Sequence, residues 1–138
     1  MIGDLKKLSL YDLAILYFKE VLREYQRSFK IVEPPPEIRK RNALSFIVFI
    51  EETGERWGCL IKDWKRPIGS DTIIKFKRIV DNLGLTAGVI IGNRISELAL
   101  DKAKRYGLLA ITRGEIISYL YSRGVDKRLE ITNEENQS

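Results

Sequence analysis

The amino-acid sequence predicts a single α/β domain in which a mixed β-sheet is covered by helices on both faces. Three observations lead to this prediction. Helical and extended patterns alternate along the chain, residues 87–91 form a continuous apolar run typical of a strand buried on both faces, and no linker or internal repeat divides the 138 residues. We expect the domain to span residues 1–125, followed by a polar, flexible tail at residues 126–138.

The chain begins with a predicted helix followed by a short strand. Ser9 and Asp12 have the spacing of a capping box, and apolar residues continue at helical spacing to about Arg27. A strand is expected at residues 29–32. The three consecutive prolines at residues 34–36 end this strand, because proline fixes the backbone and removes hydrogen-bond donors.

A hairpin is predicted next. Its strands are expected at residues 44–50 and 56–63, where β-branched and aromatic residues are frequent. The turn between them contains Gly54, which can adopt a positive φ without steric cost. These two strands therefore pair in an antiparallel manner, and they form the first part of the sheet.

The second half of the chain predicts three helices that alternate with two strands. The helices are expected at residues 70–83, 96–106 and 114–121, and the strands at residues 87–91 and 108–112. Ser70 or Asp71 is expected to cap the first of these helices, and Ser96 the second. A strand–helix–strand–helix–strand order requires parallel neighbours joined by right-handed crossovers. The sheet is therefore mixed.

The residue types present exclude several kinds of active site. The chain contains no histidine and a single cysteine, Cys59. Zinc sites built from Cys and His, Ser-His-Asp triads and internal disulfides are therefore excluded, and any metal would be a hard cation held by carboxylates. The sequence also lacks a signal-peptide pattern and an apolar run of about 20 residues, so we expect a cytoplasmic location. Abundant Ile, Lys, Arg and Glu suggest a thermophilic source.

Basic residues are concentrated in the middle of the chain. The net charge is +5, and residues 62–78 alone hold six basic and two acidic side chains. Trp57 and Trp64 flank or enter this segment, where they either stack on a base or sugar or pack in the sheet core. The pattern favours phosphate binding. We expect the contacts to nucleic acid to come from seven basic residues: Lys62, Lys65, Arg66, Lys75, Arg78, Arg39 and Arg41.

One region of the chain resembles a known family. The segments GERW at residues 54–57, IKDWKRPIG at residues 61–69 and GLTAGVII at residues 84–91 are similar to the Mrr-type branch of the restriction-endonuclease-like, or PD-(D/E)xK, superfamily. The resemblance covers about residues 44–121. It implies a mixed central sheet flanked by helices on both faces, DNA as the partner, and a homodimer.

In that family, the metal site is built on the hairpin. An Asp on its first strand, and a Glu, Asp or Gln two residues before a Lys on its second strand, hold Mg²⁺, while the lysine steadies the phosphate charge. The lysine corresponds to Lys62, but the position two residues earlier is Leu60, and the window for the Asp, residues 45–47, contains no acid. The resemblance therefore implies a degenerate catalytic motif, with no metal ligands and no cofactor.

Three functions follow from these patterns. The leading hypothesis is a catalytically inactive protein that grips the phosphate backbone with its basic turn and helix, alone or as a subunit of a DNA-processing assembly. The second is a Mg²⁺-dependent DNA endonuclease with a migrated site, in which Lys62 and Asp63 are catalytic and Glu20 is a further ligand. The third is a structural or regulatory subunit whose partner surface comprises four aromatic residues: Tyr17, Phe18, Tyr119 and Tyr121.

Overall fold

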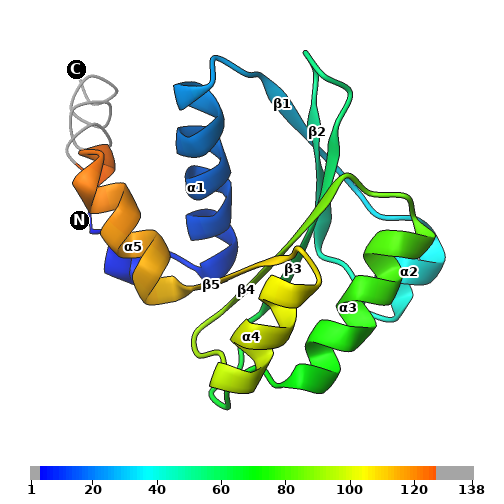
Figure 1. Ribbon diagram of the computed structural model, residues 1–138. Helices are drawn as coiled ribbons and strands as arrows, with labels where there is room; N and C mark the ends of the chain where they lie inside the picture. The colour runs from blue at the N-terminus through cyan, green and yellow to red at the C-terminus, as the bar shows by residue number, and fades with distance from the viewer. Residues whose placement is uncertain (1–3, 127–138) are drawn as a thin grey trace.

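One five-stranded sheet forms the centre of the protein, in the order β1-β2-β3-β4-β5 (Figure 1). The structure, a computed structural model, describes residues 4–126. The strands are β1 (Phe29–Val32), β2 (Phe46–Ile50), β3 (Arg56–Lys62), β4 (Ala87–Gly92) and β5 (Leu109–Thr112). β1, β2 and β3 are antiparallel neighbours, whereas β3, β4 and β5 are parallel. The predicted mixed sheet is therefore confirmed. The predicted tail, apart from its first residue, lies outside the described residues.

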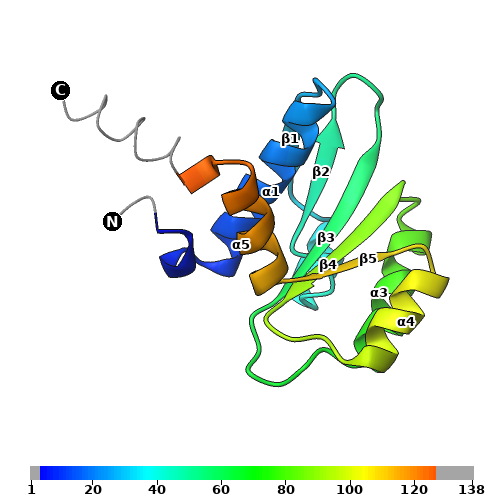
Figure 2. The ribbon, with the colours of Figure 1, turned by 60° about the vertical axis from the view of Figure 1, so that its left-hand side comes forward.

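Helices cover both faces of this sheet. They are α1 (Leu10–Glu24), α2 (Pro36–Lys40), α3 (Ser70–Asn82), α4 (Glu97–Arg105) and α5 (Arg113–Ser122), and a 3₁₀ turn, η1 (Leu5–Lys7), precedes α1. Figures 1 and 2 show α1 and α5 together on one face, and α3 and α4 on the other. None of these helices in the described part of the chain is long and apolar enough to cross a membrane.

The alternation of side chains along β3 separates two hydrophobic cores. Cys59 and Ile61 pack in the core beneath α1 and α5, whereas Leu60 packs in the core beneath α3 and α4. This division follows from the strand geometry, because successive side chains point to opposite faces. Lys62 is the last residue of β3, and its side chain lies on the same face of the sheet as Leu60 and α3. The strand thus places a lysine at the edge of an apolar core.

Several helix ends are formed as the sequence predicts. The Ser9 hydroxyl accepts a hydrogen bond from the Asp12 backbone N–H at 3.0 Å, and the Ser96 hydroxyl accepts one from Ala99 at 3.1 Å. Gly54 has the expected positive φ, 75°. Each of these residues acts within a few positions along the chain, so their roles can be inferred from local sequence alone.

Other local predictions are wrong. The first helix ends at Glu24 rather than near Arg27, because Gln26 adopts a left-handed conformation with φ 55°. Gly69 is the N-cap residue of α3, which has no side-chain cap, so the cap predicted at Ser70 or Asp71 is not formed. The structure also contains η1 and α2, which the sequence patterns did not predict. α2 starts at the last of the three prolines, a favourable first position for a helix.

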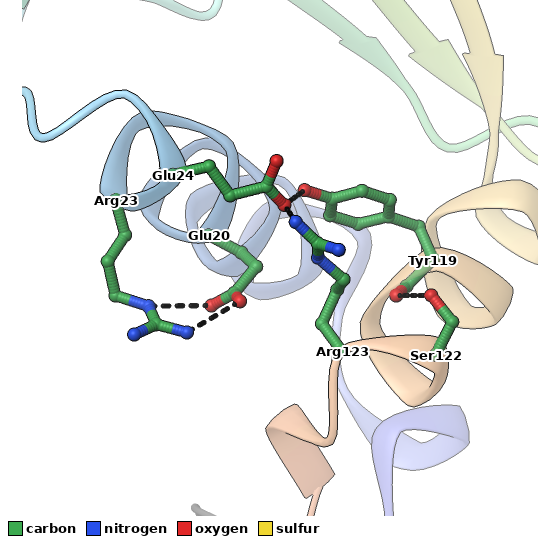
Figure 3. Close-up of polar contacts among 6 residues, drawn as sticks. All are labelled: Glu20, Arg23, Glu24, Tyr119, Ser122 and Arg123. Atoms are coloured by element: carbon green, nitrogen blue, oxygen red, sulfur yellow. Dashed lines mark hydrogen bonds and ion pairs between the residues drawn. The ribbon is translucent and has the colours of Figure 1, made fainter.

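Three of the four aromatic residues proposed as a partner surface join α1 to α5, while Tyr121 is exposed. Phe18 is 1% exposed, and the rings of Tyr17 and Tyr119 lie edge to face with centroids 5.3 Å apart. The Tyr119 hydroxyl donates a hydrogen bond to Glu24 at 2.7 Å, and Arg123 pairs with the same carboxylate (Figure 3). Burial raises the pKa of Tyr119. Three of the four aromatics are therefore engaged within the chain.

Glu20 belongs to this same helical contact. Its side chain is almost fully buried and pairs with Arg23 at 3.0 Å (Figure 3). Because α1 covers the face of the sheet opposite α3, Glu20 lies across the sheet from the Lys62 side chain. The carboxylate proposed as a further metal ligand is thus engaged by Arg23 and lies on the other face of the sheet from the Lys62 side chain.

The position of Cys59 in the central strand generates a first prediction. Cys59 is fully buried, and burial raises the pKa of its thiol far above the ordinary value. Since the thiolate is the reactive species, we expect Cys59 in the native protein to resist a water-soluble thiol reagent and to react completely after denaturation. The absorbance of the chromophore that the reagent releases measures the reaction of Cys59 in the native and in the denatured protein. Rapid and complete labelling of the native protein would contradict this burial.

The close packing around β4 generates a second prediction. A Cβ atom at Gly88 would lie 2.8 Å from Leu108, 2.8 Å from Val80 and 3.0 Å from Phe76. We expect Gly88→Ala to lower the free energy of unfolding by about 1–3 kcal/mol, because the added methyl overpacks the core.

Gly114 in α5 provides the control for this measurement, since nothing lies within 4 Å of a Cβ placed there. Gly114→Ala should leave stability unchanged or raise it by up to about 1 kcal/mol, because alanine restricts the unfolded chain. Urea unfolding curves measure both variants. Equal stability of the two variants would show that the space around Gly88 is larger than described.

Candidate nucleic-acid interface

An open groove of about 770 Å³ lies between the carboxyl end of β3, the segment that joins α2 to β2, and α3. Five basic residues line it: Arg41, Lys62, Arg66, Lys75 and Arg78. Asp71 is the one acidic residue among the residues that line this groove, so its lining carries a net charge of +4. We call this feature the basic groove.

One wall of the basic groove is a face of α3. Asp71, Lys75, Arg78 and Asn82 recur at intervals of three or four residues, so they lie along one stripe of the helix. The opposite side of the helix carries Ile73, Phe76 and Val80, which are buried in the core. The amphipathic pattern of this helix therefore orients its basic stripe towards the groove while its apolar residues fix it to the sheet.

Trp64 organises the turn that follows β3. The Arg66 guanidinium lies 4.1 Å from the centre of the indole ring, and the Lys62 ammonium lies 5.2 Å from it. Such cation–π contacts hold two positive charges beside one aromatic ring. The Lys62 Nζ also donates a hydrogen bond to the Asn42 carbonyl at 3.3 Å, which ties it to the opposite side of the groove.

The two tryptophans therefore have different environments. Trp64 packs against the α3–α4 core and lines the basic groove, whereas Trp57 packs against the α1–α5 core, with its ring 6.3 Å from that of Phe18. Of the two roles that the sequence left open, Trp57 has the core role. Trp64 contacts the Lys62 ammonium and the Arg66 guanidinium at the basic groove.

The floor of the basic groove is apolar. Leu60 and Phe76 contribute to it, and Ile47 of the neighbouring strand belongs to the same hydrophobic core. Leu60 is 4% exposed and Ile47 is 5% exposed. Ile47 is paired with Gly58, and both Ile47 and Leu60 pack in the core beneath α3 and α4, so these two side chains share a face of the sheet.

These residues do not fit a metal ion. Mg²⁺ prefers oxygen ligands in octahedral geometry, and the side chains of Ile47 and Leu60 offer only hydrocarbon. Within residues 4–126, no group of three or more His, Cys, Asp or Glu side chains is arranged to hold a metal. Leu60, two residues before Lys62, is thus part of the core, and residues 45–47 offer no carboxylate.

Asp63 takes part in a polar cluster instead. Its carboxylate accepts a hydrogen bond from the Asn93 amide at 2.7 Å, and the same amide nitrogen donates to the Trp64 carbonyl at 3.0 Å. Arg113 completes the cluster: its Nε donates to the Asn93 side-chain oxygen at 2.9 Å, and its Nη1 donates to the Leu8 carbonyl at 2.8 Å. We call Asp63, Asn93 and Arg113 the Asn93 clamp.

Backbone contacts extend the Asn93 clamp to the rest of the turn. The Ile68 N–H donates to the Arg94 carbonyl at 2.9 Å, and the Ser96 N–H donates to the Ile68 carbonyl at 3.0 Å. Ile68 itself is fully buried. The turn that carries Trp64 and Arg66 is therefore attached to the loop after β4 at both of its ends.

The structure brings together five of the seven predicted phosphate contacts. Lys65 is exposed on the same turn but does not line the basic groove. Arg39 pairs with Glu33 at 2.5 Å and borders a second hollow of about 400 Å³, which Lys62 and Asp63 also line. Arg39 and Lys65 thus flank the basic groove.

The sequence patterns did not identify Asn93 and Arg113. A signal for them exists, because the carboxyl ends of parallel strands meet at one edge of a sheet, where polar residues converge. Asp63, Asn93 and Arg113 each follow directly after one of the strands β3, β4 and β5. The strand assignments alone would therefore have placed these three side chains together.

Comparison with known proteins supports the fold. No protein-family model and no curated protein matches this sequence. A solved structure, MspJI restriction endonuclease in complex with a 27-mer oligonucleotide, is similar with a TM-score of 0.51 and 16% sequence identity. The similar region covers 75% of this chain and 25% of that one. At this identity the similarity concerns the fold alone, and this protein has a restriction-endonuclease-like fold.

Proposed function

We propose that this protein binds the phosphate backbone of DNA in the basic groove and does not hydrolyse it. The observation that carries this proposal is the convergence of five cationic side chains, from three separate segments, around an apolar floor. The similar solved structure contains an oligonucleotide, which supports DNA as the ligand. A groove open to solvent suits a continuous polymer better than an enclosed small molecule.

Phosphate contacts alone carry no sequence information. Arg66 is stacked on Trp64, and Lys62 is held by the Asn42 carbonyl, so both charges are positioned before any ligand arrives. Lys75 and Arg78 extend this charge along α3. Binding should therefore depend on the backbone of the ligand and little on its bases.

We propose that the protein does not hydrolyse DNA because the apolar residues at the floor of the basic groove offer no metal ligands. Metal-dependent cleavage of a phosphodiester requires ions that stabilise the attacking and leaving oxygens. Ile47 and Leu60 provide no ligand for them, and Asp63 is held by Asn93. Lys62 is the last residue of β3, the position that the resemblance assigns to a phosphate-binding lysine. These features support a member of the Mrr-type branch with a degenerate motif, acting alone or within a DNA-processing assembly.

Salt dependence tests the binding proposal. Each cation that neutralises a phosphate releases counterions, so the logarithm of the association constant for duplex DNA should fall with the logarithm of salt concentration with a slope between about −3 and −5. Arg78→Ala should weaken binding to all sequences alike and make the slope shallower by about 1. Fluorescence anisotropy with labelled duplexes of unrelated sequence measures both quantities.

Arg105→Ala is the matched control, because Arg105 is also an exposed arginine on a helix but lies on α4, where it pairs with Asp101 at 2.9 Å. This variant should bind DNA like the unchanged protein. Equal losses of DNA affinity in Arg78→Ala and Arg105→Ala, or a salt slope near zero, would contradict binding in the basic groove. A complete lack of binding would favour the structural or regulatory function instead.

Cleavage assays test the second half of the proposal. Labelled duplex, single-stranded and branched DNA should remain intact in Mg²⁺ or Mn²⁺, while shifted complexes persist on the same gels. Cleavage that EDTA abolishes, and that Lys62→Ala or Asp63→Ala removes, would overturn the proposal and establish a migrated metal site. Lys62→Ala alone should weaken binding, because it removes one phosphate contact.

A further inference from the structure

The outer edge of β5 differs from the outer edge at the other side of the sheet. β1 and β5 are the two terminal strands in the described part of the chain. β1 contains Lys30, which pairs with Glu51, and prolines follow it at residues 34–36. β5 has the sequence Leu-Ala-Ile-Thr, without a charge or a proline. Natural proteins usually protect exposed edges with such residues, because an unprotected edge pairs with other strands.

Apolar side chains flank this edge. Leu109 of β5 is 43% exposed, and Leu100 of α4 is 41% exposed. Both border an open hollow of about 480 Å³ between α4 and β5, together with Ala103, Leu108 and Ala110. Leu108 and Ala110 continue this apolar surface onto α4, whereas Leu109 alternates with them and lies on the face that Ile111 shares, so both faces of the strand edge are apolar.

The charges on this side of α4 are arranged in order along the helix. Glu97, Asp101 and Lys104 border the same hollow, at helical intervals of four and three residues. Glu97 is the first residue of α4, Asp101 lies in its middle and pairs with Arg105, and Lys104 lies near its end. Within the described residues, neither Glu97 nor Lys104 forms an ion pair.

We propose that this face is the interface of a homodimer, in which β5 pairs with the β5 strand of a second copy in antiparallel orientation. Parallel crossover connections make α4 run antiparallel to β5. A two-fold axis at the edge therefore also sets α4 antiparallel to its counterpart. Glu97 of each copy then lies beside Lys104 of the other, so the charge pattern complements itself and selects a second copy of this chain as the partner.

The resulting dimer has one continuous sheet across both copies. Its contacts would cover Leu100 and Leu109 and satisfy the outward backbone groups of β5. No residue of this interface lines the basic groove. Dimer formation and DNA binding are therefore separate properties, and failure of one in an experiment does not imply failure of the other.

Sedimentation equilibrium of the complete chain, without nucleic acid, tests the proposal. The chain has a mass of 16.0 kDa, so a dimer has twice this mass. We expect the dimer mass at micromolar concentrations. Leu109→Lys should raise the dissociation constant by about tenfold or more, because it places like charges opposite each other at the strand edge. A monomer mass for the unchanged protein would overturn the proposal.

Charge reversal distinguishes this interface from any other. Lys104→Glu should weaken the dimer, because it places Glu97 of the partner beside a second carboxylate. Combining it with Glu97→Lys should restore the dimer, since the two charges are exchanged in both copies. Failure of the double variant to recover affinity, while its circular dichroism spectrum matches that of the unchanged protein, would overturn the antiparallel arrangement.

Leu98→Lys serves as the matched control. Leu98 is 75% exposed, more than any other large hydrophobic residue between positions 4 and 126, and it lies on α4 outside the proposed interface. This variant should retain the dimer mass. If Leu98→Lys dissociates the dimer and Leu109→Lys does not, the second copy uses a different face and the proposal is wrong.

Discussion

The parallel pairing of β3 with β4 is the interaction on which the rest of the structure depends. Its register runs from Trp57 opposite Ala87 to Lys62 opposite Gly92. This pairing brings the ends of the two strands together, so that the turn after β3 meets the loop after β4. The Asn93 clamp then fixes the turn. The basic groove exists because its charged residues are attached to this rigid central pair.

The floor of the basic groove is apolar, whereas a Mg²⁺ site would need oxygen ligands. Buried carboxylates at the edge of a core are costly unless a metal or other partner compensates their charge. Ile47 and Leu60 avoid that cost, and they extend the core up to Lys62. Five basic residues surround this apolar floor.

Aromatic residues perform different tasks on the two faces of the sheet. On the α1–α5 face, Tyr17, Phe18 and Tyr119 join helices that are distant in sequence. On the other face, Trp64 combines core packing with support for Arg66. The difference follows from location, because Trp64 lies past the end of a strand, where one side of the ring borders the groove. Residues of similar chemistry therefore contribute to folding at one place and to the candidate site at another.

The sequence by itself determined the alternation of helices and strands, the mixed sheet and the basic stripe of α3. It also determined that Lys62 has an apolar residue two positions before it. These properties depend on periodicity and on residues close together in the chain, such as Ser9 with Asp12 or Lys75 with Arg78. The early end of α1 and the cap of α3 were not predicted, because Gln26 and Gly69 depend on backbone conformation that periodicity does not specify.

Only the tertiary structure decided which charges meet. It brought Arg41 to the same groove as Lys75, left Lys65 outside that groove, and engaged Asp63 with Asn93. It also placed Glu20 across the sheet. The physical reason is that these contacts join residues far apart in the chain. They are fixed by strand pairing and by the crossover connections, and a local pattern contains no information on either.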